Sequence, residues 1–140
     1  FDKILEKTRE NPVFYVQYCY ARISSLFRTL KVDINSEFEI DKNNFNLNEH
    51  ELYLFRKIID WPKVIETASI KLEPHRIPFY LYELATLFHS YWSKGNEDAN
   101  YKFIINEKIK NKNTLLIIKL VSLTIENGMK ILGVQLPTKM

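Results

Sequence analysis

Residues 11–30 read NPVFYVQYCYARISSLFRTL, and this stretch decides the fold class. Asn11 can cap the free amides of a helix that starts at Pro12, because proline leaves no backbone N–H unpaired there. Apolar side chains then recur at steps of three and four residues, at Val16, Tyr20, Ile23, Phe27 and Leu30. Such spacing is typical of one buried helix face. The sequence therefore predicts a helix over residues 12–30.

A polar segment separates this helix from the next two. Residues 32–47 are rich in Asp, Asn, Glu and Ser and have no sustained period, which indicates a loop lying across the surface. Asn48 can cap a second helix, and Trp61-Pro62 ends that helix and starts a third. Their predicted buried sides hold Leu52, Phe55, Ile58 and Ile59 in the second helix and Val64, Ile65, Ala68 and Leu72 in the third.

A long helix is predicted after Glu73-Pro74, reaching about Trp92. Pro78 lies near its start, so either the regular helix begins near Pro78 or its entry is kinked. Residues 95–98 then form a polar turn, residues 101–105 are extended, and residues 108–112 form an exposed connection that carries lysines.

The last predicted helix is capped by Asn113 or Thr114 and ends before Asn127-Gly128, where an apolar tail leads to Met140. Its inward side chains are Ile117, Ile118, Val121 and Ile125. We see no internal repeat and no series of strands. The fold class is therefore all-α, a bundle of about five helices.

Length and composition favour a single domain over residues 1–140, because 140 residues with 46% hydrophobic content suffice for one packed core. The chain opens with Phe1 rather than Met, and we expect residues 1–10 to continue a segment upstream. No apolar run approaches the roughly 20 residues of a membrane span, and no signal peptide is recognisable. We expect a soluble, cytoplasmic protein.

Catalytic groups do not converge in the sequence. His50, His75 and His89 lack ligand spacing, and three glycines form no phosphate-binding loop. The single cysteine, Cys19, lies in an apolar helical pattern and reads as a small buried hydrophobe. These residues are therefore predicted to be noncatalytic and to bind no metal.

A second face of the first helix is the candidate functional surface. Tyr15, Tyr18 and Arg22 cluster at about 100° per residue, roughly a quarter to a third of a turn from the apolar stripe. Aromatic rings and guanidinium groups can stack on unpaired RNA bases. The net charge of +3 is compatible with a local basic face.

Three segments of the chain stand out together: NPVFYVQYCYARI at 11–23, EPHRI at 73–77 followed by YLYELA at 80–85, and NGMKILGV at 127–134 before Met140. These segments resemble the C-terminal DALR-type anticodon-binding domain of arginyl-tRNA synthetases, and they occur in the order found in that family. The sequence departs from the family where Asn113-Thr114-Leu115 replaces Ala-Arg-Leu, and where Pro78 replaces a small residue.

The resemblance implies a class I arginine–tRNA ligase whose catalytic domain lies upstream and uses ATP and Mg²⁺, with no cofactor in residues 1–140 themselves. The implied partners are arginine tRNA and that catalytic domain, and neither DNA nor a membrane is expected. Carried over by position, the residues implied to contact the anticodon loop are Tyr15, Tyr18, Arg22 and Met140. Further candidates are Arg76, Trp92 and Tyr91, of which one of the last two is expected to face the core.

Other interpretations remain open for the same residues. Tyr15 and Tyr18 could pack on the catalytic domain instead of RNA, and the whole chain could be a helical docking domain without base recognition. His75 is predicted to be structural. Lys108, Lys110 and Lys112 read most simply as a solvated run, although they could reach phosphates.

Overall fold

The computed structural model describes residues 11–140, which fold into five α-helices and a two-stranded hairpin. The helices are α2 (Pro12–Leu30), α3 (Glu49–Ile59), α4 (Trp61–Ile70), α5 (Arg76–Glu97) and α6 (Lys112–Leu132). The shorter elements are the 3₁₀ turns η1 (Lys42–Asn44) and η2 (Ala99–Tyr101) and the strands β1 (Ile104–Ile105) and β2 (Lys108–Ile109). The predicted all-α bundle of about five helices is confirmed, and the expectation for residues 1–10 lies outside the described residues.

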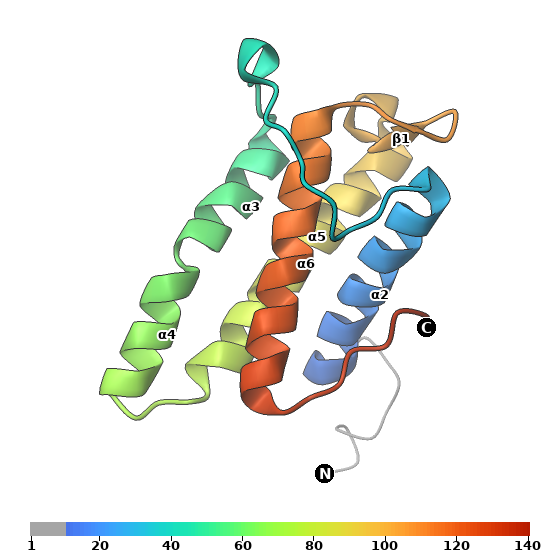
Figure 1. Cartoon of the computed structure of the whole chain (residues 1–140). Helices are drawn as coiled ribbons and strands as arrows, with labels where there is room; N and C mark the ends of the chain where they lie inside the picture. Colours follow the sequence, from blue (N-terminus) through green and yellow to red (C-terminus); the bar gives the residue numbers. More distant parts are fainter. Residues whose placement is uncertain (1–10) are drawn as a thin grey trace.

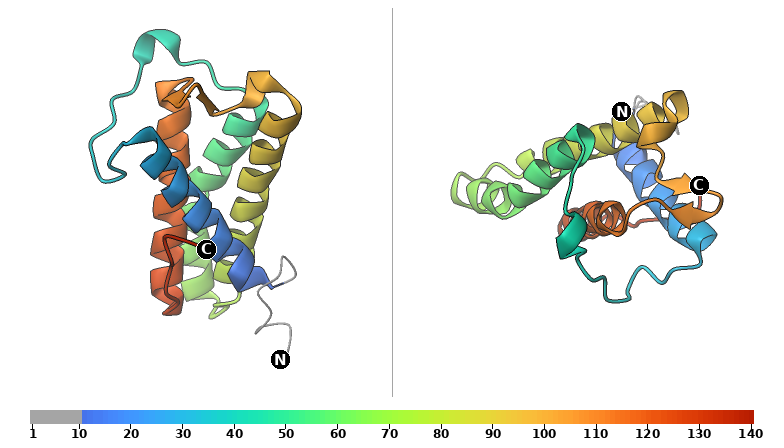
Figure 2. Two further views of the ribbon diagram at one scale, coloured as in Figure 1. Left: turned by 90° about the vertical axis from the view of Figure 1, so that its right-hand side faces the viewer. Right: turned by 90° about the horizontal axis from the view of Figure 1, so that it is seen from above.

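Helix α5 has the most extensive packing in the bundle. It contacts α2, α3, α4 and α6, with α3 and α4 following one another along one edge and α2 along the other (Figure 1). Seen from above, α5 and α6 face each other between these two edges (Figure 2). The side chains that are 0% exposed come from all the long helices and include Ile23, Leu54, Leu84, Phe88 and Ile118.

Side-chain caps fix where α2 and α3 begin, as the sequence predicts. The side chain of Asn11 accepts hydrogen bonds from the amides of Val13 and Phe14, at 3.1 and 3.3 Å. Asn48 and Glu51 form a reciprocal capping box at the start of α3. Pro78 lies inside the first turn of α5, where a missing N–H leaves no helical bond broken.

A buried carboxylate joins three helices at the upper end of the bundle. Glu51 of α3 is 3% exposed. It accepts hydrogen bonds from the hydroxyl of Tyr91 in α5 at 2.9 Å, from the hydroxyl of Thr114 in α6, and from the amide of Asn48 at 3.1 Å. The Asn48 side chain donates in turn to the Tyr91 hydroxyl at 2.9 Å. These bonds fix the rotation of α3, α5 and α6 about their own axes.

Two predicted helix ends are wrong because tertiary packing overrides local turn signals. Helix α5 continues past Trp92 to Glu97, so most of the predicted turn at residues 95–98 is helical. Gly95 is needed there because a Cβ would lie 3.0 Å from the carbonyl oxygen of Tyr101. Helix α6 likewise runs through Asn127 and Gly128 to Leu132, and Gly133 ends it with a left-handed φ of 70°.

The start of α6 also differs from the prediction. Asn111 caps it by accepting from the Asn113 amide at 2.8 Å. Asn113 and Thr114, predicted as caps, are buried inside the bundle and bond to other elements. Two residues predicted to be buried are instead exposed, Ile59 at 58% and Leu72 at 86%, since Leu72 lies beyond α4 in a left-handed conformation.

The polar segment at residues 32–47 crosses the surface over α6, as predicted (Figure 1). The Asn113 side chain accepts from the Asp41 amide at 3.1 Å and donates to the carbonyl of Asn44 at 3.2 Å. Lys119 donates to the Ser36 carbonyl at 2.7 Å. These bonds tie the loop to α6 along much of its length.

Gly128 of α6 lies directly against the Leu81 side chain of α5, which leaves no room for a side chain at position 128. A Cβ at this position would lie 2.7 Å from the Leu81 methyl groups, and Leu81 is 1% exposed. We expect Gly128→Val to lower the free energy of unfolding by about 1–3 kcal/mol in chemical denaturation, because the buried Leu81 side chain or its helix must shift. Lys130→Val, on the exposed side of α6, should change it by no more than about 0.5 kcal/mol. Equal losses for the two variants would contradict this account.

Candidate functional site

Arg22 of α2 is held between two aromatic rings. Its guanidinium carbon lies 4.6 Å from the ring centroid of Tyr18 and 4.8 Å from that of Trp92. One terminal nitrogen donates to the Tyr18 hydroxyl at 2.6 Å, and the other lies 3.2 Å from Nδ1 of His89. Tyr18 is one helical turn before Arg22, whereas Trp92 and His89 come from α5. Both helices are therefore needed to build this arrangement.

The charge of Arg22 is stabilised by rings rather than by a carboxylate. None of the ion pairs found within residues 11–140 includes Arg22. Each cation–π contact contributes about 0.5–1 kcal/mol at exposed sites and more when water is excluded. A guanidinium has five N–H donors, and the two hydrogen bonds above leave donors for a further acceptor. The group is fixed in place and has no carboxylate partner between residues 11 and 140.

His89 organises the aromatic residues around Arg22. It is 8% exposed, and its ring centroid lies 4.6 Å from that of Tyr15 and 5.5 Å from that of Tyr18. Because arginine can only donate, Nδ1 of His89 must be the acceptor, which places the imidazole proton on Nε2. Tyr15 also contacts the ring of Tyr82 at 5.2 Å. Tyr15 therefore packs against α5 as well as flanking the site.

A hollow of about 570 Å³ opens beside the Arg22 guanidinium. Among the residues that line it are Tyr18, Arg22, Trp92, Ile104 and Met140. Among the residues that the structure describes, its wall also includes the basic side chains of Arg28 and Lys139 and no Asp or Glu side chain. This hollow combines aromatic surface with positive charge, which suits a ligand that has planar rings and acceptor or anionic groups.

The last eight residues fold back along α2 and complete the hollow (Figures 1 and 2). The left-handed turn at Gly133 reverses the chain. Gln17 donates to the carbonyl of Gln135 and Arg28 donates to the carbonyl of Thr138, each at 2.9 Å. These two bonds hold the tail on a path that brings Met140 to the same hollow as Arg22.

Comparison with known families shows what kind of domain has this geometry. The profile of the DALR anticodon binding domain matches residues 16–140. The chain belongs to this family.

Individual relatives agree with the family assignment. The chain is 48% identical to the arginine–tRNA ligase of Pelagibacter ubique over 140 residues, which are all of this chain and 24% of that protein. It is 40% identical to the corresponding ligase of Roseobacter denitrificans over 139 residues, covering 96% of this chain and 24% of that protein. The chain thus spans about a quarter of the length of these relatives.

A solved structure gives the same picture of the fold. The crystal structure of a putative arginyl-tRNA synthetase from Campylobacter jejuni superposes with a TM-score of 0.79 at 26% sequence identity. The superposition covers 99% of this chain and 29% of that one.

The DALR domain brings together most of the residues that the sequence singles out. Tyr18, Arg22, Trp92 and Met140 line one hollow, and Tyr15 borders a smaller one that also includes Tyr18 and Arg22. Trp92 is partly exposed whereas Tyr91 is 2% exposed, so one of this pair does face the core as expected.

Two further candidates lie away from the hollow. Tyr91 donates its hydroxyl to Glu51, and burial raises the pKa of that hydroxyl above its ordinary value. Arg76 is at the other end of α5, where it pairs with Glu73, and its hydrogen bond lowers the pKa of the Glu73 carboxyl. Both side chains are already engaged in contacts within the domain.

Sequence reasoning missed His89, Gln17 and Arg28. His89 precedes Trp92 by three residues, which places both on one face of α5, and that spacing was the available signal. Gln17 and Arg28 act on backbone carbonyls more than 100 residues away, and no local pattern marks such a contact.

The structure also shows the environment of Cys19 and allows a search for metal sites and membrane spans among the described residues. Cys19 is 0% exposed as predicted, and burial raises the pKa of its thiol. The part of the chain that the structure describes contains no group of three or more His, Cys, Asp or Glu side chains able to hold a metal ion. None of the helices between Asn11 and Met140 combines the length and apolarity of a membrane span.

The acceptor role of His89 can be tested by two matched substitutions. His89→Asn keeps an acceptor near the position of Nδ1, whereas His89→Phe keeps a ring but loses the acceptor. We expect the Arg22 Nε–H order parameter from NMR to stay near its wild-type value in His89→Asn and to fall below about 0.6 in His89→Phe. Equal order in both variants would show that the rings alone hold Arg22.

The anchoring of the tail gives a second prediction. Replacing Gln17 and Arg28 together by Ala removes two side-chain bonds, each contributing about 0.5–1.5 kcal/mol. We expect amide order parameters of residues 135, 136, 138 and 139 to drop toward about 0.6 or below while those of α2 remain near about 0.85. Ser25→Ala, an exposed change on the same helix, serves as the control. An unchanged tail in the double variant would assign its position to Val134 and Leu136 instead.

Proposed function

We propose that this chain binds the anticodon loop of a tRNA, with the hollow beside Arg22 as the place where unpaired bases lie. The observation that carries the proposal is the Arg22 guanidinium, fixed between Tyr18 and Trp92 with no carboxylate partner in the described residues. The family name and the arginine–tRNA ligase relatives support the same function.

The chemistry of the hollow matches what single-stranded RNA offers. Bases that leave the stack in a loop expose flat faces and hydrogen-bonding edges. Stacking on an aromatic side chain contributes about 1–3 kcal/mol per base, and a fixed guanidinium can donate to a base edge or a phosphate. In our proposal Tyr18 and Trp92 provide stacking surface, Arg22 donates, and Met140 borders the bound nucleotides, while Tyr15 lines the smaller hollow that also contains Tyr18 and Arg22.

The proposal extends to the protein of which this domain is a part. By analogy with the relatives, the remaining three quarters would carry ATP- and Mg²⁺-dependent attachment of arginine to its tRNA in the cytoplasm. The anticodon-binding domain would supply recognition of arginine tRNA and no catalytic group. The isolated chain should therefore bind tRNA without charging it.

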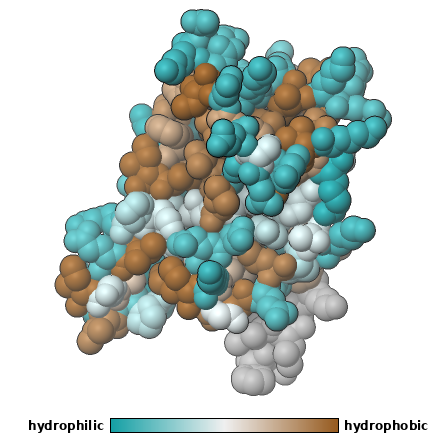
Figure 3. Space-filling view, viewed as in Figure 1, coloured by the Kyte–Doolittle hydropathy of each residue, from teal (hydrophilic) through white to brown (hydrophobic). Residues whose placement is uncertain are grey.

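A second candidate function is docking onto another protein surface without base recognition. Exposed apolar side chains favour it at the end of the bundle opposite the hairpin, where Ile70 is 72% and Leu72 86% exposed. Brown residues gather over this end of α4 in Figure 3. The two functions use different faces, and only the first requires a response to the anticodon sequence.

Base recognition by Arg22 can be measured by titration. The chain is titrated with arginine-accepting tRNA and with the same tRNA altered at the middle anticodon base. We expect the wild type to prefer the intact anticodon, and Arg22→Ala to weaken that binding about 10- to 100-fold, since a hydrogen bond to a charged group contributes about 1.5–3 kcal/mol. The preference should largely disappear in Arg22→Ala.

A matched control is Arg56→Ala, which removes an exposed arginine from α3 and should leave both affinities unchanged. Equal wild-type affinity for the two tRNAs would mean that the hollow contacts only the RNA backbone and does not recognise the base. Absence of binding would favour docking.

A further inference from the structure

We propose that the β1–β2 hairpin and its flanking lysines bind the phosphates of the RNA strand as it leaves the hollow. This inference rests on the proposed function and adds a partner surface to it. The surface consists of Lys102, Lys108, Lys110 and Lys112, and we call it the basic hairpin.

The basic hairpin is continuous with the hollow beside Arg22. Trp92 and Ile104 line that hollow and also a second one of about 250 Å³, whose wall includes Tyr101 and Lys102. Seen from above, the hairpin lies beside the end of α2 and the end of the chain (Figure 2). A strand with one base against Trp92 can thus pass over Ile104 and meet Lys102 next.

The charge of this segment is unbalanced. Residues 102–112 contain four lysines and a single acidic residue, Glu107. None of these lysines takes part in the ion pairs found between residues 11 and 140. Lys110 donates to the carbonyl of Asn100 at 2.7 Å, while the other three are exposed without such a bond. The hairpin lies at the upper right in Figure 1, and the surface at the upper right of Figure 3 is largely hydrophilic.

The hairpin holds these charges on a preformed support. Its two turn residues, Asn106 and Glu107, have φ values of 52° and 61°, the pattern of a tight two-residue turn with both residues left-handed. Phe103, at its base, is 5% exposed and contacts the rings of Tyr91 and Trp92 at 4.4 and 5.6 Å. Because the backbone is fixed, binding need order only the lysine side chains.

RNA phosphate is the partner that fits this arrangement. Contacts to phosphates position a nucleic acid without reading its sequence, whereas contacts to bases specify it. The hollow offers the aromatic and donor groups of base contact, and the basic hairpin offers charge alone. In this inference the hollow binds the bases of one RNA strand and the basic hairpin binds its phosphates.

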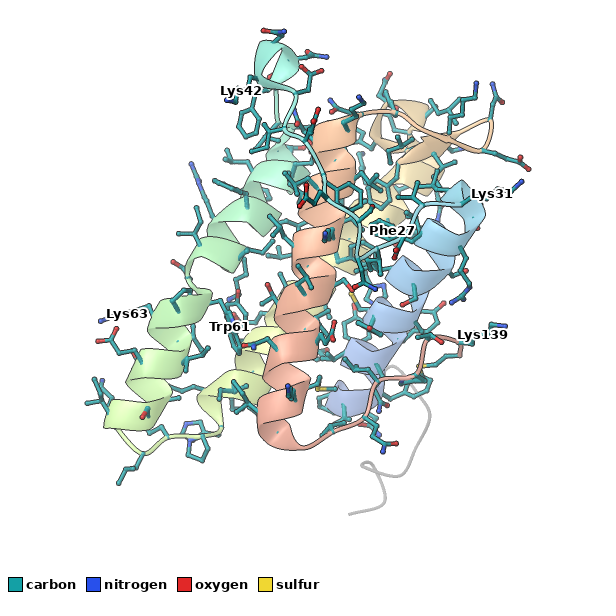
Figure 4. All side chains as sticks on the ribbon, viewed as in Figure 1. Phe27, Lys31, Lys42, Trp61, Lys63 and Lys139 are labelled. Atoms are coloured by element: carbon teal, nitrogen blue, oxygen red, sulfur yellow. The ribbon has the colours of Figure 1, made fainter. Side chains whose placement is uncertain are left out.

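The experiment compares two triple variants of equal charge change. Lys102, Lys108 and Lys112 are replaced by Gln in one, and Lys63, Lys71 and Lys130 in the other; all six lysines are exposed. In Figure 4 the control residue Lys63 lies on α4, at the edge of the bundle opposite α2. Affinity for both tRNAs is measured from about 50 to 200 mM salt.

We expect the hairpin variant to reduce the slope of log K against log salt by about 2, since each phosphate contact to a single strand contributes about 0.7. At about 50 mM salt its affinity should fall about tenfold or more, equally for the intact and the altered anticodon. The control variant should keep a slope within about 0.5 of wild type.

Opposite results separate this inference from the proposed function. If wild type binds and prefers the intact anticodon but the hairpin variant keeps its slope and affinity, the basic hairpin is not a phosphate site and the hollow still is a base site. A similar loss in both triple variants would overturn the inference by showing a diffuse effect of net charge. Failure of the wild type to bind either tRNA would overturn both.

Discussion

The buried carboxylate of Glu51 is the constraint on which the upper half of the bundle depends. A carboxylate that is 3% exposed is stable only if donors replace water, and here Tyr91, Thr114 and Asn48 do so. Loss of one donor leaves a buried charge only partly satisfied, at a cost of about 1–3 kcal/mol or more. The network therefore tolerates little rotation of α5. Since Trp92 follows Tyr91, the same bond that satisfies Glu51 directs the indole toward Arg22.

The site is thus assembled from rigid elements rather than from loops. Arg22, Tyr18 and His89 stand on two helices that pack side by side, and the donors not used within the domain face a hollow. Fixing a guanidinium in advance lowers the entropy that binding must overcome. A flexible arginine on a loop would make the same contacts only after being ordered.

The sequence predicts those features whose cause is local. Asn11-Pro12 and Asn48 begin helices through their own side chains, and the apolar stripe of α2 follows from its spacing. Helical periodicity placed Tyr18 and Arg22 on one face of α2, whereas Met140 was identified by resemblance to a family, because no local rule brings residue 140 to residue 22. Gly95 and Gly128 misled the prediction, since both serve close packing inside a helix rather than its termination. His89 escaped notice because its partners lie on another helix.

The two bonds that hold the tail end on backbone carbonyls, at Gln135 and Thr138, and not on side chains. Every amino acid presents the same carbonyl, so the anchoring places no demand on the identity of residues 135 and 138. Positions 17 and 28, in contrast, need side chains that carry a donor and are long enough to reach these carbonyls. Positions 135 and 138 can therefore change in sequence without loosening these two bonds, and selection that maintains the bonds acts on residues 17 and 28, near the opposite end of the chain.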